Sequence, residues 1–173
     1  MRGLRVPCLI APDVPLYAVD GVFNAVVAEG DFVGRSVYEG RGAGERATAS
    51  AVVADLMDIA VGRRAPTFGV PVGALKTLPI RDLNKRVGAS YVRLTVVDRP
   101  GVFADIASAF RDEDVSMESV LQRGRNVNAN VNVVIVTHDV EDAALLRALK
   151  RLQNNAAVVE PPHMMRIETL RPA

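Results

Sequence analysis

The sequence predicts an α+β fold in which a short mixed segment precedes a larger domain of four strands and two helices. Two observations support this prediction. Residues 4–62 place strand patterns ahead of a single helical pattern, whereas residues 89–173 alternate strand and helix patterns in a regular order. A length of 173 residues allows one domain with a substantial core or two small ones.

The N-terminal half is predicted to contain strands at residues 4–10 and 22–39, the second of which folds back as a hairpin with its turn at Gly30–Asp31. An amphipathic helix is predicted from about Ala47 to Val61, because its apolar residues recur at spacings of three and four. Residues 62–88 are rich in proline, glycine and basic residues, which is typical of a linker. This linker is expected to pack against its neighbours through three large apolar side chains, Phe68, Leu75 and Leu78.

The C-terminal half begins with a strand at residues 90–98, in which Val92, Leu94 and Val96 alternate with residues of the opposite face. A helix follows from Gly101 to about Asp112. Its apolar face is predicted to hold Val102, Phe103, Ile106, Ala107 and Phe110.

Two further strands, at residues 115–124 and 129–138, are joined by a polar hairpin loop. A second helix is predicted from about Val140 to Leu152 with Asp139 as its N-cap, and a last strand at residues 163–169. The apolar side of this helix is expected to comprise Leu145, Leu146, Leu149 and Leu152. The resulting β-α-β-β-α-β order is that of a ferredoxin-like domain, with four antiparallel strands and two helices on one face.

Composition argues against several classes of function. A net charge of +1 gives no electrostatic reason to expect nucleic acid or an anionic membrane as a partner, and no segment has the roughly 18 uncharged apolar residues of a membrane helix. The central strands offer no aromatic platform for RNA bases. Neither His138 nor His163 belongs to a pattern of metal ligands, and the single cysteine, Cys8, is expected to be a buried structural thiol. The chain is therefore predicted to be soluble and cytoplasmic, without a metal site.

The stretch LTVVDRPGVFADIASAF, residues 94–110, joins a strand to a helix through a short turn. Pro100 suits the first helical turn, where its missing N–H costs nothing. Gly101 removes a side chain where a helix N-terminus presents unpaired donors and a partial positive charge. From the residues alone, two interpretations of Asp98 stay open: it caps the helix, or it belongs to a pocket for a small charged ligand.

Two resemblances add to these predictions. VRLTVVDRPGVFADIASAF and VSMESVLQRG resemble an ACT domain, a small regulatory module that senses amino acids, over about residues 89–171. VDGVFNAVVAEGDFVGRSVYEGRGAGERATASAVVADLMDIA resembles the end of the catalytic domain of homoserine dehydrogenase. The resemblance implies the C-terminal portion of an NAD(P)-dependent oxidoreductase that interconverts L-homoserine and L-aspartate 4-semialdehyde. That enzyme serves threonine and methionine biosynthesis, and its bacterial forms are commonly inhibited by threonine.

The ACT resemblance implies an effector site at the turn after the first strand, across an interface with a second ACT domain. The expected effector is L-threonine or another small amino acid. Its carboxylate would meet the N–H groups of the helix end, its ammonium would meet Asp98, and its hydroxyl would meet Gln122. The effector-binding residues implied in this way are Asp98, Pro100, Gly101, Val102, Phe103 and Gln122.

The loop GRGAG lies between a predicted strand and a predicted helix, and from its residues alone it is either a tight turn or a ligand site. The homoserine dehydrogenase resemblance implies that Gly40, Gly42 and Gly44 reach the nicotinamide half of the cofactor, with Gly42 as the expected contact. The sequence contains no Gly-x-Gly-x-x-Gly fingerprint, and the family's catalytic lysine has no match in it. We therefore expect no catalytic residue, no bound NAD(P) and no turnover in the isolated chain.

These features predict three parts: residues 1–62 as the C-terminal part of a catalytic and dimerisation domain, residues 63–88 as a linker, and residues 89–173 as an ACT regulatory domain. Open strand edges in both halves predict a homo-oligomer. One alternative is a freestanding ACT protein that binds an amino acid or only joins subunits. The first sixty residues argue against this alternative, because a freestanding sensor would have no use for them.

Overall fold

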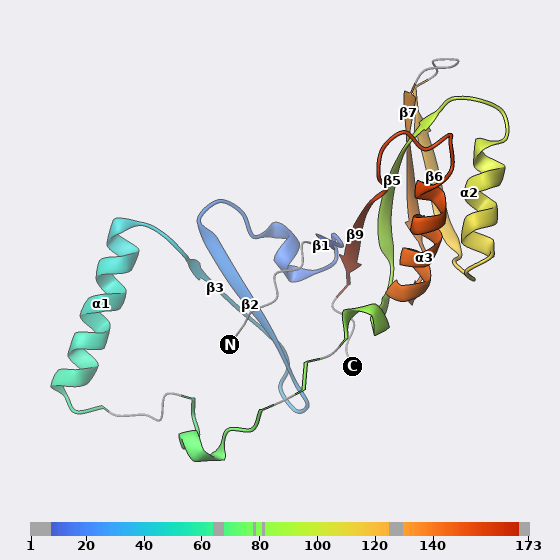
Figure 1. Ribbon diagram of the computed structural model, residues 1–173. Helices are drawn as coiled ribbons and strands as arrows, with labels where there is room; N and C mark the ends of the chain where they lie inside the picture. Colours follow the sequence, from blue (N-terminus) through green and yellow to red (C-terminus); the bar gives the residue numbers. More distant parts are fainter. Residues whose placement is uncertain (1–7, 64–67, 78, 81, 125–129, 170–173) are drawn as a thin grey trace. The chain divides into compact units, whose positions relative to one another are not determined.

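The computed structural model describes residues 8–63, 68–77, 79–80, 82–124 and 130–169. The chain divides into two compact units, one formed by residues 1–11 with 81–170 and the other by residues 12–80 with 171–173. The predicted fold class is confirmed: helices and strands are mixed, and the larger unit has the expected β-α-β-β-α-β order (Figure 1).

The larger, C-terminal unit is built on a five-stranded sheet. Its strands lie in the order β1 (Cys8–Ile10), β9 (His163–Glu168), β5 (Ser90–Val97), β7 (Asn130–Thr137) and β6 (Met117–Arg123). The pairs β9–β5, β5–β7 and β7–β6 are antiparallel, whereas β1 pairs parallel with β9. Residues 8–10 therefore belong to this sheet, although the sequence analysis grouped them with the N-terminal half.

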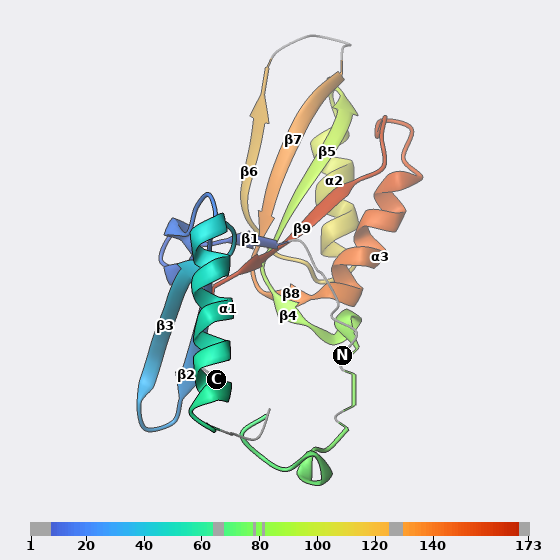
Figure 2. The same ribbon diagram turned by 90° about the vertical axis from the view of Figure 1, so that its left-hand side faces the viewer.

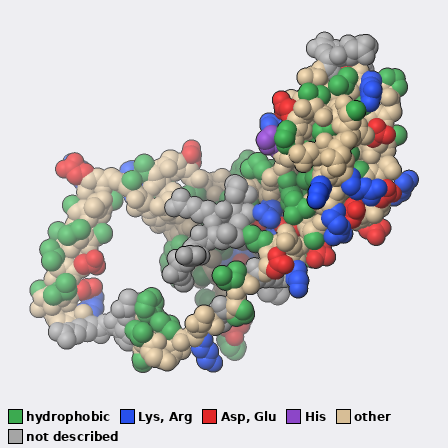
Figure 3. Space-filling model, viewed as in Figure 1, with side chains coloured by type: hydrophobic (Ala, Val, Ile, Leu, Met, Phe, Trp, Pro, Cys, Tyr) green, Lys and Arg blue, Asp and Glu red, His purple; other side chains and the backbone are tan. Residues whose placement is uncertain are grey.

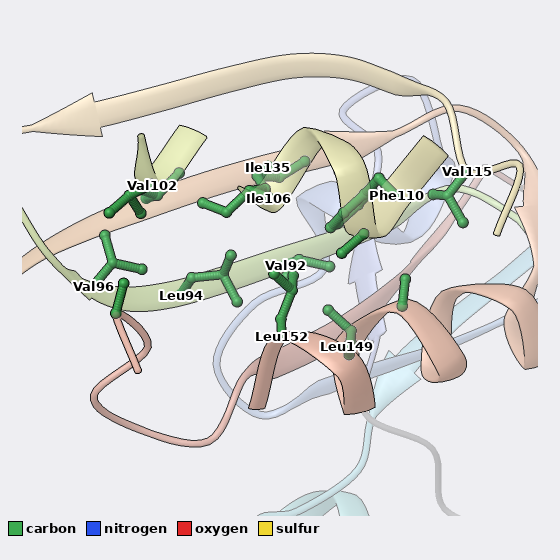
Figure 4. Close-up of a cluster of buried hydrophobic side chains, with 14 of the residues drawn as sticks. Val92, Leu94, Val96, Val102, Ile106, Phe110, Val115, Ile135, Leu149 and Leu152 are labelled. Carbon is green, nitrogen blue, oxygen red and sulfur yellow. The ribbon is translucent and has the colours of Figure 1, made fainter. Parts of the chain in front are cut away.

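The core of this unit lies between the sheet and two helices, α2 (Val102–Arg111) and α3 (Asp142–Gln153), which cover the same face (Figures 1 and 2). The alternation in β5 turns Val92, Leu94 and Val96 toward these helices, and none of the three is more than 2% exposed. Figure 4 shows them facing side chains that α2 and α3 contribute to the core, among them Ile106, Phe110, Leu149 and Leu152.

The predicted helix faces are wrong at three positions. In α2, Phe103 and Ala107 are exposed, and Ala109 is buried instead. In α3, Leu146 is 42% exposed, and Ala148 is buried. A repeat of 3.6 residues per turn explains both outcomes. The buried residues of each helix are one, three or four positions apart and form a single stripe, and the remaining apolar side chains lie beside this stripe.

The start of α3 also differs from the prediction. Val140–Glu141 form a short strand, β8, antiparallel to β4 (Val87–Gly88). The helix therefore begins at Asp142, and Glu141 rather than Asp139 is its N-cap residue, without a capping hydrogen bond from its side chain. Because pairing with β4 keeps Val140–Glu141 extended, the cap lies two residues further along the chain than predicted.

Charged residues connect the end of α2 to α3. Asp112 contacts Arg111 at 2.8 Å and Arg151 of α3 at 2.9 Å. The hydrogen bond from Arg111, with the positive charge of both arginines, lowers the pKa of Asp112 from its usual value, against a smaller opposing effect of desolvation. This ion pair is therefore sensitive to acid.

We expect Arg111→Gln to raise the pKa of Asp112 in an NMR titration of its side-chain carbon. Because folding lowers this pKa, the associated stabilisation is present above the pKa of the unfolded chain and is lost as the pH falls through the folded pKa. Arg151→Gln should produce a smaller rise, since its hydrogen bond contributes least. Identical titration curves in the three proteins would contradict this assignment.

The N-terminal unit contains a hairpin and one long helix. β2 (Phe23–Gly30) and β3 (Gly34–Arg41) pair antiparallel, and α1 (Glu45–Ala60) follows, starting two residues before the predicted Ala47. The hairpin is confirmed but its predicted turn is wrong, since Gly30 pairs with Gly34 across a loop of three residues. Gly34, at φ 71°, supplies the left-handed residue that such loops favour. Short 3₁₀ helices lie at Pro15–Ala18 (η1) and Val72–Ala74 (η2) here, and at Leu83–Lys85 (η3) in the other unit.

The surface of the N-terminal unit is unusually apolar. Helix α1 has no buried residue, and hydrophobic side chains are visible along it in Figure 3. At least half of each of its large apolar side chains is exposed: Val52, Val53, Leu56, Met57 and Ile59. Phe68 and Leu75 are 61% and 47% exposed, so the predicted packing of the linker is wrong for both, and Leu78 lies outside the described residues. Exposed apolar surface of this extent is typical of interaction surfaces.

The structure bears on the membrane helix, the metal site and the reactive residues that were considered from the sequence. Among the described residues, no helix is long and apolar enough to cross a membrane. Over those same residues, no group of three or more His, Cys, Asp or Glu side chains is placed to bind a metal ion. His138 directly follows β7 and His163 begins β9, as expected, while Cys8 in β1 is half-buried rather than buried.

Candidate functional site

The turn between β5 and α2 is the strongest candidate from the sequence. β5 ends at Val97, and Gly101 occupies the N-cap position of α2. Its φ of 94° is a left-handed conformation that residues other than glycine rarely adopt. Pro100 precedes the N-cap, so its predicted place inside the first helical turn is wrong. A Cβ at Gly101 would meet nothing within 4 Å, which means that backbone conformation, not crowding, requires the glycine.

The helix end at this turn presents backbone donors. The carbonyl of Gly101 accepts the first hydrogen bond of the helix, from the amide of Asp105 at 3.0 Å. The amides of Val102, Phe103 and Ala104 precede Asp105, so no helical carbonyl is available to accept from them. A glycine N-cap provides no side chain to satisfy them. Three aligned N–H groups and the positive end of the helix dipole suit an anionic group such as a carboxylate.

Two predicted effector residues meet beside this helix end. The side-chain amide of Gln122, on β6, donates to Oδ1 of Asp98 at 3.3 Å in a partly buried position. In the described part of the chain, this is the hydrogen bond that holds the Asp98 carboxylate, and no α2 amide donates to it. An ionised carboxylate only accepts, so the amide nitrogen of Gln122 faces Asp98 and its carbonyl oxygen is left for a donor. The arrangement offers an anionic group and a hydroxyl acceptor next to backbone donors.

We expect Gly101→Val to lower the free energy of unfolding by about 1–3 kcal/mol, because a β-branched residue is strained at a positive φ. Gly101→Asn is the matched variant: it also adds a Cβ, but asparagine tolerates the left-handed region and should cost less. Urea denaturation measures both. Equal losses for the two variants would show that something other than backbone conformation makes the glycine necessary.

The segment GRGAG joins β3 to α1, as predicted, and its first two residues belong to β3. Gly40 is in β3, the amide of Gly42 donates to the carbonyl of Val22 at 2.7 Å, and Gly44 is the N-cap of α1 at φ 127°. A Cβ on Gly42 would lie 1.8 Å from the side-chain nitrogen of Asn24, so a residue with a side chain fits only if Asn24 moves. Beside the loop is a hollow of about 440 Å³ whose lining residues are Arg41, Gly44, Glu45, Arg46 and Ala47.

The structure also brings together charged residues that the sequence analysis missed. Asp142 is fully buried and forms ion pairs with Arg86 and Arg166. Arg86 also forms an ion pair with Glu168. Arg86 lies in the stretch interpreted as a linker, where a basic residue carries no signal of burial. From the sequence, Asp142 falls in the first turn of the predicted helix, where an aspartate is usually solvated and interacts with the helix dipole.

Family comparisons agree with both halves of this description. Residues 4–57 match the family model described as homoserine dehydrogenase, and residues 90–156 match the model described as ACT domain. The chain has the sequence of a homoserine dehydrogenase C-terminal region followed by an ACT domain. The candidate turn at residues 98–104 falls in the ACT region, and the GRGAG loop falls in the homoserine dehydrogenase region.

Individual relatives extend the match over almost the whole chain. The chain is 36% identical to the homoserine dehydrogenase of Helicobacter pylori over 166 residues, and 38% identical to that of Synechocystis sp. over 177 residues. Each alignment covers 95% of this chain and 39% of the relative. A crystal structure of homoserine dehydrogenase from Thiobacillus denitrificans superposes with a TM-score of 0.78 at 33% identity, covering 96% of this chain and 38% of that one. The chain thus spans about two fifths of the length of these homoserine dehydrogenases.

Proposed function

We propose that this chain is the regulatory and subunit-joining portion of a homoserine dehydrogenase, in which L-threonine binds at the turn between β5 and α2. The whole enzyme would interconvert L-homoserine and L-aspartate 4-semialdehyde with a nicotinamide cofactor. The observation that carries the proposal is the meeting of Asp98 and Gln122 beside the donors of α2. These groups complement an ammonium, a hydroxyl and a carboxylate, the three polar groups of threonine.

Binding at this turn follows from simple pairing of charge. The threonine carboxylate would accept from the amides of Val102 and Phe103, and its ammonium would pair with Asp98. The carbonyl oxygen of Gln122 would accept from the threonine hydroxyl. Phe103, which is 46% exposed, would lie in the interface with a second copy that closes the site.

Isothermal titration with L-threonine and with L-2-aminobutyrate, which lacks only the hydroxyl, tests the proposed role of Gln122. The wild-type chain should bind threonine about tenfold more tightly, as one hydrogen bond of about 1–1.5 kcal/mol predicts. Gln122→Ala should remove the preference, whereas the matched Gln153→Ala, at an exposed position of α3, should keep it. If the chain binds neither amino acid at millimolar concentration, the sensing function is refuted and joining subunits remains as the role of the ACT domain.

The GRGAG loop is proposed to contribute to the cofactor site of the whole enzyme. Its glycine backbone, its own Arg41 and the nearby Arg46 suit part of an anionic dinucleotide, but the sequence provides no Gly-x-Gly-x-x-Gly loop for the pyrophosphate. The cofactor, when bound, supplies the hydride acceptor and donor. The role proposed for this chain is limited to contact through Gly42 and its neighbours.

We therefore expect the isolated chain to show no NADPH binding by calorimetry at 100 μM and no homoserine oxidation. The reason is that a dinucleotide held at one loop lacks the contacts that fix its phosphates. L-threonine in the same preparation serves as the positive control for a folded protein. Micromolar NADPH affinity would overturn the assignment of this loop to a partial site.

We also propose that the chain forms a homodimer or a larger oligomer. β6 is an outer strand of its sheet, β2 and β3 form a sheet of two strands only, and α1 has no buried residue. Open edges and uncovered apolar surface both favour association. Sedimentation velocity at 10–100 μM should show a dimer or larger species. A stable monomer throughout that range would contradict the proposal.

A further inference from the structure

The buried Asp142 is held by two arginines from different parts of the chain. Its side chain is 1% exposed, with Arg166 Nε 2.6 Å from Oδ2 and Arg86 Nη1 3.4 Å from Oδ1. A carboxylate removed from water requires such partners, because burial of an unpaired charge costs several kcal/mol. Asp142 is the first residue of α3, so this pairing attaches the helix to both arginines.

Arg86 extends the cluster to the end of β9. Its Nη2 donates to Glu168 at 2.8 Å and to the carbonyl of Ile167 at 2.9 Å, and its own carbonyl accepts from the amide of Asp142 at 2.8 Å. Gly88 leaves room for the guanidinium, since a Cβ at that position would lie 2.8 Å from its nitrogens. Arg86 is therefore fixed by side-chain and backbone contacts together.

Two connections join the segment of residues 12–80 to the C-terminal unit, and both begin at this cluster. The chain leaves the C-terminal unit after Ala11 and returns to it at residue 81. On the first connection, β1 pairs with Arg166–Glu168 of β9, and the amide of Ala11 donates to the carbonyl of Glu168 at 3.2 Å. On the second connection, the side chain of Arg86 forms ion pairs with Glu168 and Asp142. Both connections therefore meet at Glu168, the first through its backbone carbonyl and the second through its carboxylate.

The cluster and the candidate effector turn lie at opposite ends of β5. Ser90, the first residue of the strand, pairs with Arg166, and the strand ends at Val97 just before the turn. Eight residues of strand span roughly 25 Å. Pairing with β7 and β9 on either side makes β5 a stiff element between the two places.

We propose that Arg86, Asp142, Arg166 and Glu168 form a clamp that holds both connections as one cooperative element. Loss of the clamp releases the two connections together while the core stays folded. This inference goes beyond the proposed function, because it concerns how the regulatory unit controls the segments that leave it, whatever ligand it binds. A ligand that tightens the C-terminal unit would, through this clamp, tighten both connections at once.

Amide hydrogen exchange by NMR on the full chain tests the clamp without any ligand. The amide of Ala11 reports on the first connection, and the amide of Asp142, bonded to Arg86, reports on the second. In Arg86→Met, both amides should exchange at least tenfold faster and by factors that agree within threefold, while Leu94 and Ile135 in the core keep their rates. The matched Arg147→Met removes an exposed ion pair with Glu113 of the same unit and should change neither reporter more than twofold.

Two outcomes would overturn the proposal. If the Asp142 amide exchanges faster and the Ala11 amide does not, the two connections are held independently. If neither amide exchanges faster, the charged cluster does not hold either connection. Should Arg86→Met unfold the core, as Leu94 would reveal, Glu168→Gln provides the same test with a smaller change. It keeps the side-chain size but removes the charge that pairs with Arg86, and it should accelerate both amides together. A response at Ala11 alone would then refute joint release.

Discussion

Replacing Asp142 with alanine should lower the free energy of unfolding of the C-terminal unit by about 3–5 kcal/mol. The change leaves Arg166, which is only 21% exposed, without its carboxylate, and leaves Arg86, which is 18% exposed, with Glu168 as its remaining carboxylate. Breaking a buried ion pair by removing one partner is costly because the remaining charges lose both water and their counter-ion. A loss of this size is a large part of the total stability of 5–15 kcal/mol that is usual for small domains.

The matched control is Asp105→Ala. Asp105 is also an aspartate in the first turn of a helix, but it is exposed and bonded to Asn155. Both variants lose the same favourable interaction with a helix N-terminus, worth about 0.3–1 kcal/mol, so the difference between them isolates the buried cluster. Urea denaturation monitored by circular dichroism measures both. Equal losses would show that the buried cluster contributes little and would weaken the basis of the clamp.

The second large effect concerns the affinity for threonine. Asp98→Ala should weaken binding by about tenfold to a hundredfold, because a hydrogen bond to a charged group contributes about 1.5–3 kcal/mol and each 1.4 kcal/mol is a factor of ten. The alanine also releases Gln122 from its bond to Asp98, so the hydroxyl contact loses its orientation. Gly101→Val should abolish binding, since its side chain would occupy the space before the amides of α2.

Asp105→Ala again serves as the control for this second prediction. It changes the charge near the same helix end without touching Asp98 or Gln122, so the affinity should stay within about twofold. Calorimetry on the wild-type chain and the two aspartate variants measures the difference. If Asp105→Ala weakens binding as much as Asp98→Ala, the effect comes from general electrostatics and not from an ammonium contact.

Local patterns were enough to predict the fold of the C-terminal unit. The alternation of Val92, Leu94 and Val96 and the stripe of Val102, Ile106 and Phe110 specify which faces meet, because one face of each element is apolar. Errors arose where a distant segment decides the outcome. Pairing of β8 with β4 moved the cap of α3 from Asp139 to Glu141, and pairing of residues 8–10 with β9 required a partner 158 residues away.

The candidate site was predictable in part for the same reason. The turn at Gly101 is local, and its left-handed conformation agrees with the glycine in the sequence. The resemblance to ACT domains placed Asp98 and Gln122 at one site, but nothing in the sequence predicted the hydrogen bond between them, which joins segments separated by a helix. No pattern in the linker could have indicated that Arg86 is paired with a buried carboxylate, because the pairing depends on tertiary structure.

NMR shift mapping can locate the binding of an amino acid at the β5–α2 turn residue by residue. On addition of 5 mM L-threonine, the largest amide shifts should fall on Asp98, Gly101, Val102 and Phe103 and on the side-chain amide of Gln122. L-Alanine and D-threonine at the same concentration should produce weaker shifts, because one lacks the hydroxyl and the other presents it in the wrong direction. Saturable shifts at this turn are the predicted result; an unchanged spectrum, or shifts confined to other parts of the chain, would contradict it.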